Sequence, residues 1–225
     1  MKLSRIGLKI LYHINERNVS SSKSQILQDI FVLNELEFKR NGYFVDFGAT
    51  DGKEFNNTYL LEKEYNWTGI LCEPSKGWHK SLEINRPNVI KDYRCVWSKS
   101  GEKIRFKECD ANTLSTIEAF ENSDQHYESR KKGISYFVET VSLTDLLDDH
   151  GAPLEIDYLS IDSEGSEYEI LKNHNFDKYS FKVITCEHNF TEKREKIHDL
   201  LHTKGYKRKL ERGDQSDFED WYVKN

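Results

Sequence analysis

Several features of extended, cross-linked or membrane-spanning proteins are scarce in this sequence. Its 225 residues include only 3 prolines and 12 glycines, which excludes collagen-like and low-complexity architectures. No apolar run approaches the roughly 20 residues that a membrane-spanning helix needs. Basic residues are not in excess: 33 Lys and Arg stand against 39 Asp and Glu, so the whole chain shows no basic footprint for nucleic acid. The 12% of aromatic residues is too high for a disordered chain of this polarity, and the length suits one domain with a sizeable core.

The cysteines do not form a metal-binding pattern. Cys72, Cys95, Cys109 and Cys186 include no C-x-x-C pair, and their spacing matches no zinc ribbon or finger. Three of the four lie in apolar runs that are typical of strands. We therefore interpret them as free, buried thiols and expect a reducing, cytoplasmic compartment.

The first residues do not read as a secretory signal. Met1–Asn15 carries basic residues, but its longest apolar run, Ile10–Tyr12, is too short for the apolar core of a signal peptide. Its apolar positions fall on one helical face. A basic amphipathic helix usually packs on its own domain, and it can also make a weak peripheral contact with a membrane or a partner. We expect a helical extension over residues 1–23 and one domain over residues 24–225.

Segments with helical and strand periodicity alternate along the rest of the chain. Helices are predicted over Ser24–Arg40 (with Ser24 as N-cap), Asn57–Tyr65, Ser75–Asn85, Leu143–His150, Glu167–His174 and Thr191–Lys204. Strands are predicted over Tyr43–Phe47, Thr68–Cys72, Val89–Trp97, Lys103–Phe106, Tyr136–Ser142, Ile156–Asp162 and Phe181–Glu187, followed by a hairpin of Tyr206–Arg212 with Asp220–Lys224. This alternation predicts an α/β fold: a parallel sheet with helices on both faces and an antiparallel hairpin at one edge. Ala111–Gly133 has no clear period and is either a lid or surface decoration.

Acidic residues follow the main predicted strands. Ligands of such sheets bind beyond the carboxyl ends of the strands, so these residues are the first candidates for a site. They are Asp46 and Asp51, Glu73, Asp162 with Glu164, and Glu187 with His188.

The turn after the first predicted strand distinguishes between cofactors. Gly48–Gly52 does not have the G-x-G-x-x-G spacing of dinucleotide sites, which disfavours a nucleotide-linked oxidoreductase. Asp46 and Asp51 would also repel a pyrophosphate. S-adenosylmethionine has an ammonium and a sulfonium and no phosphate, so it suits this turn, and Glu73 is placed to accept hydrogen bonds from both ribose hydroxyls.

Several segments together resemble one family, the FkbM-type S-adenosylmethionine-dependent methyltransferases. Tyr43–Gly52 resembles its glycine motif, Ile70–Pro74 its ribose acid, and Asp157–Leu171 its most recognisable segment. Smaller matches are Ser24, Gln25, Gln28 and Asp29, the pair Asn57 and Thr58, and the pair Arg86 and Pro87. The resemblance runs from about Ser24 to the C-terminus. It implies a class I, Rossmann-like, doubly wound sheet of seven mostly parallel strands. It also implies methyl transfer, commonly to oxygen and often on sugars or secondary metabolites.

The resemblance also implies roles for individual residues. Those expected to bind the cofactor are Asp46, Gly48, Ala49 and Asp51 at the methionine part, Glu73 and Pro74 at the ribose, Cys95 and Val96 at the adenine, and Gln25, Gln28 and Asp29 closing the pocket, with Asp162 at the methyl. Thr50 stands where many relatives have Asn.

Transfer to a hydroxyl needs a proton acceptor near the methyl. The candidates are Asp162, His188 and Glu164. Each has a structural alternative: Asp162 as a helix cap, His188 as an ordinary loop histidine, and Glu164 as a first-turn acid favoured by the helix dipole. Asp162, Glu187 and His188 would permit a divalent metal, but nothing in their spacing demands one, so none is expected.

Other readings stay open at this point. Arg130–Lys132 could meet an anionic acceptor or form a solvated face. The leading hypothesis is an oxygen methyltransferase acting on a glycan or a small metabolite. The alternative is a catalytically silent module that binds S-adenosylmethionine. The acidic balance of the chain lowers the case for an RNA methyltransferase. The sequence does not name the acceptor or the oligomeric state.

Overall fold

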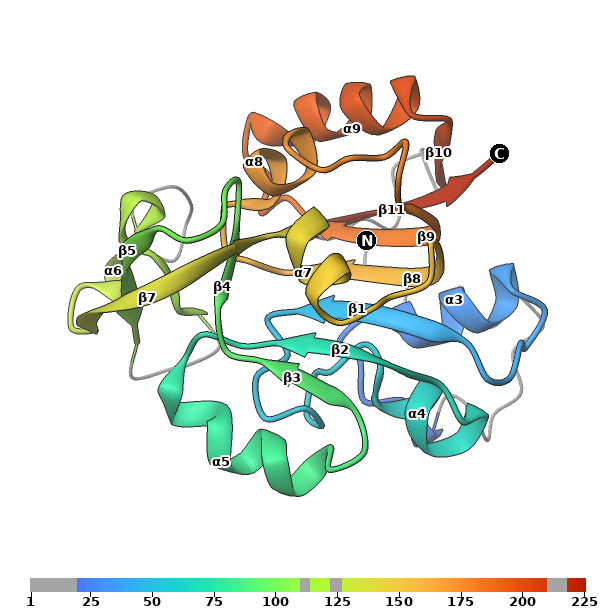
Figure 1. Cartoon of the computed structure of the whole chain (residues 1–225), viewed down its shortest axis with the longest axis horizontal. Helices are drawn as coiled ribbons and strands as arrows, with labels where there is room; N and C mark the ends of the chain where they lie inside the picture. Colours follow the sequence, from blue (N-terminus) through green and yellow to red (C-terminus); the bar gives the residue numbers. More distant parts are fainter. Residues whose placement is uncertain (1–19, 110–113, 122–126, 210–217) are drawn as a thin grey trace.

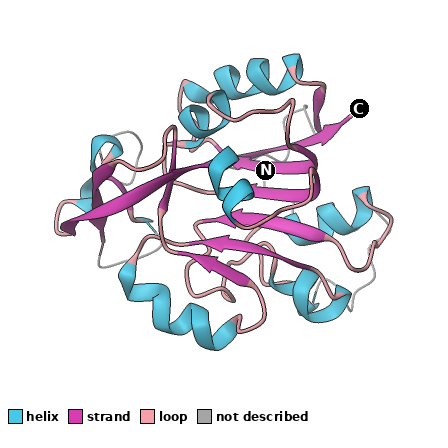
Figure 2. Cartoon of the chain, viewed as in Figure 1, coloured by secondary structure: helices cyan, strands magenta, loops and turns pink. Residues whose placement is uncertain are grey.

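A twisted sheet of seven strands lies at the centre of the molecule (Figures 1 and 2). The computed structural model describes residues 20–109, 114–121, 127–209 and 218–225. The strand order is β10-β11-β9-β8-β1-β2-β3. Their bounds are β1 Tyr43–Phe47, β2 Thr68–Cys72, β3 Ile90–Asp92, β8 Glu155–Ile161, β9 Ser180–Glu187, β10 Tyr206–Lys209 and β11 Glu219–Lys224. β11 is antiparallel to both of its neighbours and the other pairings are parallel, so the mostly parallel sheet with a C-terminal hairpin is confirmed.

Helices cover both faces of this sheet, as the alternating sequence pattern predicts. One apolar core joins the sheet to α3 (Gln28–Glu35), α4 (Tyr59–Tyr65) and α5 (Lys76–Asn85). A second core on the opposite face joins it to α7 (Leu143–Asp149), α8 (Glu167–Lys172) and α9 (Lys193–Thr203). In β1 and β8, side chains on both faces are buried, which explains why these strands read as continuous apolar runs.

A second, four-stranded sheet has the order β4-β7-β5-β6 and lies beside the carboxyl ends of the large sheet (Figure 1). Its strands are β4 Cys95–Trp97, β5 Lys103–Glu108, β6 Thr116–Ile117 and β7 Ile134–Ser142. The predicted single strand Val89–Trp97 is therefore wrong: it divides into β3 and β4, which belong to different sheets. Arg94 fixes the break, because its guanidinium is 2.6 Å from Asp92 and 2.9 Å from Asp149.

The first helix is shorter than predicted. α3 begins at Gln28 rather than Ser24, and Leu27 before it has a left-handed φ of 68°. The Ser24 hydroxyl does not cap the helix, because it donates to Asp29 Oδ1 at 2.7 Å. Ser22 donates to the same oxygen at 2.8 Å. Asp29 thus draws two hydroxyls inward, and residues 22–27 form a bent segment instead of a first helical turn.

Part of the segment without clear period is ordered. Within Ala111–Gly133 the structure describes β6, a 3₁₀ turn at Glu118–Phe120 and α6 (Tyr127–Arg130). The helix expected over Met1–Asn15 lies outside the described residues. Among the residues that are described, no helix has both the length and the apolar character needed to cross a membrane.

Candidate functional site

A cavity of about 470 Å³ opens beyond the carboxyl ends of β1, β2, β8 and β9. Its opposite wall comes from the small sheet, through Phe106 on β5 and Ile117 on β6. Nine of the predicted site residues line it: Gln25, Gly48, Glu73, Pro74, Cys95, Val96, Asp162, Glu164 and Glu187. The structure thus brings together the residues that follow four separate strands.

Glu73, at the end of β2, is held rigidly in the cavity wall. The backbone N–H of Thr50 donates to its Oε2 at 2.8 Å, and that of Ser75 donates to Oε1 at 2.8 Å. Each carboxylate oxygen keeps a further lone pair for a ligand. Burial raises the pKa of Glu73 to about 7, against the lowering effect of these two N–H groups. Thr50 has a φ of 49°, a conformation that Asn adopts more readily than Thr.

Gly48 allows the β1 turn to approach the end of β8. It has a φ of 73°, and a Cβ added there would lie 2.1 Å from the backbone oxygen of Asp162. Any other residue would force these two chain segments apart. The glycine therefore brings the turn after β1 and the first residue after β8 into one wall of the cavity.

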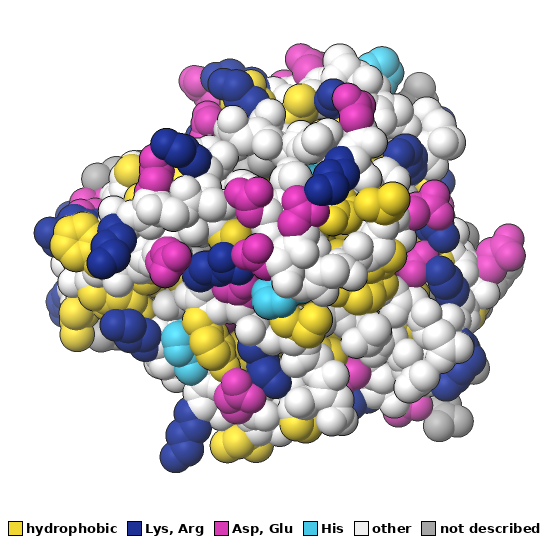
Figure 3. Space-filling model, viewed as in Figure 1, with side chains coloured by type: hydrophobic (Ala, Val, Ile, Leu, Met, Phe, Trp, Pro, Cys, Tyr) yellow, Lys and Arg dark blue, Asp and Glu magenta, His cyan; other side chains and the backbone are white. Residues whose placement is uncertain are grey.

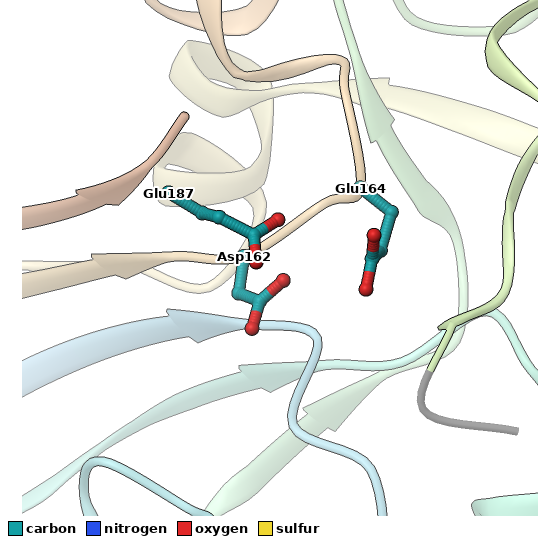
Figure 4. A group of neighbouring side chains, drawn as sticks. All are labelled: Asp162, Glu164 and Glu187. Atoms are coloured by element: carbon teal, nitrogen blue, oxygen red, sulfur yellow. The ribbon is translucent and has the colours of Figure 1, made fainter. Parts of the chain in front are cut away.

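Three acidic side chains converge at the far end of this wall (Figure 4). One oxygen from each of Asp162, Glu164 and Glu187 lies within 4.8 Å of the other two. Burial and the charge of Glu167 raise the pKa of Asp162 to about 7. Burial and the neighbouring charge of Asp162 hold the pKa of Glu187 well above its ordinary value. The carboxyl groups of Asp162 and Glu187 adjoin each other and both have raised pKa values, so at neutral pH the pair keeps at least one proton.

Glu164 is neutralised by Arg130. The guanidinium of Arg130 is fully buried and donates to Glu164 Oε2 at 2.7 Å. It also donates to the backbone oxygen of Leu114 at 2.8 Å, so it ties the segment before α6 to the turn after β8. Of the basic run Arg130–Lys132, the first residue is therefore an internal ion-pair partner, while Lys131 is exposed and pairs with Glu128 at 2.6 Å.

Six residues predicted for the site do not line the cavity: Asp46, Ala49, Asp51, Gln28, Asp29 and His188. The side chains of Asp46 and Asp51 point to local partners. Asp46 accepts hydrogen bonds from Asn56 Nδ2 at 3.0 Å and Thr58 Oγ1 at 2.8 Å, and burial raises its pKa. Asp51 Oδ1 accepts the backbone N–H groups of residues 53 and 54 within its own turn.

Gln28 and Asp29 are buried behind the wall rather than in it. Gln28 donates through Nε2 to Glu219 Oε2 at 3.1 Å. Asp29 holds the bent segment through its two serine hydroxyls. Gln25 belongs to that segment and does line the cavity. Of Gln25, Gln28 and Asp29, only the first lines the cavity among the described residues, and Asp29 holds the bent segment to which Gln25 belongs.

His188 faces β11 instead of the cavity. Its Nδ1 accepts the backbone N–H of Phe190 at 3.0 Å, and its Nε2 lies 3.7 Å from Asp220 Oδ1. The structure therefore does not bring this ring to the acidic cluster, either as a base or as a metal ligand. Within the described residues, Arg130 pairs with Glu164 Oε2, one of the three carboxyl groups of this cluster, and we assign no metal to it.

The sequence-based reasoning missed an aromatic contribution to the cavity. Phe55, Phe190 and Phe218 line it, and the first two are 60% and 62% exposed. Phe55 and Phe190 both have a φ of 57°, so each ring is presented from a left-handed loop residue. The sequence contains an indication of these residues, because each phenylalanine follows a polar turn after a strand and does not belong to a helical or strand pattern of apolar residues.

Comparison with known proteins found similar solved structures and one family model. Similar solved chains include a precorrin-6y C5,15-methyltransferase from Geobacter metallireducens, with TM-score 0.47, 11% identity, and coverage of 91% of this chain and 92% of that chain. A TehB-like SAM-dependent methyltransferase from Corynebacterium glutamicum has TM-score 0.44, 8% identity, and coverage of 98% and 100%. No curated protein matches the sequence. The model of the methyltransferase FkbM domain matches residues 46–219, which is more than half of the chain. The chain therefore belongs to the FkbM methyltransferase family, and its methyl donor is S-adenosylmethionine.

Proposed function

We propose that this methyltransferase binds S-adenosylmethionine along the cavity and transfers its methyl group to a hydroxyl of a sugar, a glycan or a small metabolite. The observation that carries the proposal is the arrangement of the wall: Glu73, whose carboxylate two backbone N–H groups hold in place, lines one cavity with Asp162, a carboxyl group with a pKa of about 7.

The residues present fit the cofactor. Glu73 offers both oxygens from a fixed position, which suits the two ribose hydroxyls. Gly48 leaves the methionine end of the wall free of a side chain, and Cys95 and Val96 supply an apolar surface for the adenine. Both thiols in the wall, Cys72 and Cys95, have raised pKa values because of burial, so they act as inert packing groups.

The chemistry of the wall favours an acceptor without negative charge. Among the described residues that line the cavity there is no Lys, Arg or His, and the acidic cluster would repel a phosphate or a carboxylate. The exposed rings of Phe55 and Phe190 offer apolar faces against which a sugar or another ring can pack. On the face drawn in Figure 3 basic and acidic side chains are interspersed, and we propose no nucleic-acid acceptor.

The chain contributes orientation and proton transfer to this reaction. S-adenosylmethionine supplies an electrophilic methyl group when bound. Asp162 then accepts the proton of the acceptor hydroxyl, a role for which a pKa near 7 is well matched. Such general base catalysis typically contributes about 10²–10⁴-fold to the rate. Closely packed walls align the acceptor oxygen behind the methyl, which lowers the entropy cost of the displacement.

Calorimetry with S-adenosylhomocysteine tests the cofactor site. We expect binding by the wild type and none by Glu73→Ala, because the ribose would lose both acceptors. Retained affinity in that variant would contradict the assignment. Asp46→Ala tests the inner network: the sequence-based prediction is loss of binding, and the structure attributes any loss to disorder of the turn that Asn56 and Thr58 hold.

The alternative function is a silent module that binds the methyl donor without turnover. It predicts cofactor binding with no methyl transfer to any member of a broad panel of neutral sugars, polyols and phenols. Transfer to any one of them would remove this alternative. For localisation we propose a reducing, cytoplasmic compartment, which is supported by the four cysteines, all free and buried.

A further inference from the structure

We propose that Glu187 is a positioning residue: it stays protonated and donates a hydrogen bond to the Asp162 carboxylate, which leaves Asp162 to receive the acceptor's proton. This inference rests on the proposed function and goes beyond it, because it divides the two carboxyl groups into a donor and a base. Neither sequence pattern nor family membership assigns this role to Glu187.

The two side chains differ in their environments. Glu187 is buried to all but 6% of its surface, and its Oε2 has no hydrogen-bond partner among the described residues. A buried oxygen of this kind costs much more free energy when its carboxyl group is ionised than when it is neutral. Asp162 is less buried than Glu187. The inner member of the pair should therefore keep the proton, and the outer member should carry the charge.

The surroundings of the pair are negatively charged. Glu164 faces it from the turn after β8, Glu167 from the first turn of α8, and Asp46 from β1. Arg130 neutralises Glu164, and Lys193 is bound to the backbone oxygen of Gly165 at 2.6 Å. In the described structure, the charged groups that shift the pKa values of Asp162 and Glu187 most are carboxyl groups, and none of them is a cation. Two negative charges side by side are therefore disfavoured, and one proton stays between them.

The directions of the pKa shifts agree with this geometry. Burial and neighbouring negative charge raise the pKa values of both Asp162 and Glu187, so a proton is retained on the pair. The pKa of Asp162 is about 7. In the transfer step, the acceptor O–H bond breaks and Asp162 takes the proton. The acceptor oxygen forms a bond to the methyl carbon, and the electron pair of the broken carbon–sulfur bond stays on sulfur. The pair of carboxyl groups thus passes from one proton to two.

The test uses two ligands of the complete protein, and no acceptor is needed. S-adenosylhomocysteine lacks the transferred methyl, and sinefungin carries an ammonium group in that position. If Asp162 is an ionised base facing this position, sinefungin should bind about tenfold to hundredfold more tightly than S-adenosylhomocysteine, the range for a hydrogen bond to a charged group. Calorimetry in buffers of different ionisation enthalpy at pH 6.5 should also show sinefungin releasing more protons, up to about one, because its ammonium displaces the proton on Asp162.

Variants then separate the donor from the base. Glu187→Gln keeps a hydrogen-bond donor without a titrating group, so it should retain most of the sinefungin preference. Glu187→Met removes the donor at similar volume and should lose at least tenfold of that preference, and Asp162→Asn should abolish it. Glu155→Gln, at the exposed opposite end of β8, is the control and should behave as the wild type. Thermal melting of each variant checks folding.

The outcomes are distinct. Equal losses in Glu187→Gln and Glu187→Met would overturn the inference, because charge rather than donation would then matter. Equal affinity and equal proton release for the two ligands in the wild type would also overturn it, without recourse to any variant. Failure of both ligands to bind the wild type would instead refute the proposed cofactor site.

Discussion

Arg130 offers the sharpest test of how the small sheet is fastened to the site. Its guanidinium is fully buried and pairs with Glu164 at 2.7 Å. Replacing one partner of a buried pair typically costs about 3–5 kcal/mol, because the other charge is left without compensation. We therefore expect Arg130→Met to lower the free energy of unfolding by that amount. This is a large share of the roughly 5–15 kcal/mol that stabilises most domains.

The next residue in the chain provides a matched control. Lys131 is exposed and its pair with Glu128 lies at the surface, where such a contact contributes about 1 kcal/mol or less. Urea unfolding of Arg130→Met and Lys131→Met, monitored by circular dichroism, compares the loss of a buried positive charge with the loss of an exposed one. The double variant Arg130→Met/Glu164→Gln removes the stranded charge and should recover part of the loss. Equal destabilisation by the two methionine variants would refute the argument from burial.

Three further predictions concern the site and the pH dependence of the protein. Gly48→Ala should weaken S-adenosylhomocysteine binding more than tenfold in calorimetry. The added Cβ would lie 2.1 Å from the Asp162 backbone oxygen, and a φ of 73° costs an L residue about 1–2 kcal/mol. Unchanged affinity would show that the turn adapts. Glu73 has a pKa of about 7 and must be ionised to accept the ribose hydroxyls. The affinity for S-adenosylhomocysteine should therefore be constant above pH 7 and fall about tenfold per pH unit below it. The weak binding of Glu73→Gln should not show this dependence on pH. Burial raises the pKa of Asp29 to about 6, so the folded protein holds this proton more tightly than the unfolded chain. The stability that this group contributes is present below about pH 4 and is lost as the pH rises through 6, a change of about 3 kcal/mol. In urea unfolding measured over this range, Asp29→Asn should lack this change. An identical pH profile in the variant would contradict the prediction.

The positions of the strand-end residues could be predicted, but not the directions of all their side chains. Parallel strands bring their carboxyl ends to one edge, so Glu73, Asp162 and Glu187 meet whatever the details of packing. The direction of Asp46 depends on Asn56 and Thr58, which lie 10 and 12 residues away in sequence. No local pattern in a single sequence contains that information.

The cavity wall that faces the carboxyl ends of the large sheet could not be predicted, for a different reason. It depends on the antiparallel pairing of β5 with β7, whose partners lie about thirty residues apart, so no short hairpin turn indicates the pairing. The division of Val89–Trp97 likewise depends on the ion pair of Arg94 with Asp149, which only the folded chain brings together. His188 is turned by Asp220, on a strand that follows it after α9 and β10.

The seam between the two sheets has an evolutionary consequence. Glu73 and Gly48 belong to the large sheet and its turns, whereas Phe106 and Ile117 face them from paired positions of the small sheet. In the proposed arrangement, exchanges on β5 and β6 can therefore reshape the room for an acceptor while Glu73 and Gly48, which are assigned to the ribose and the methionine part, stay in place. A lineage with this architecture is free to acquire new acceptors while the donor it uses stays the same.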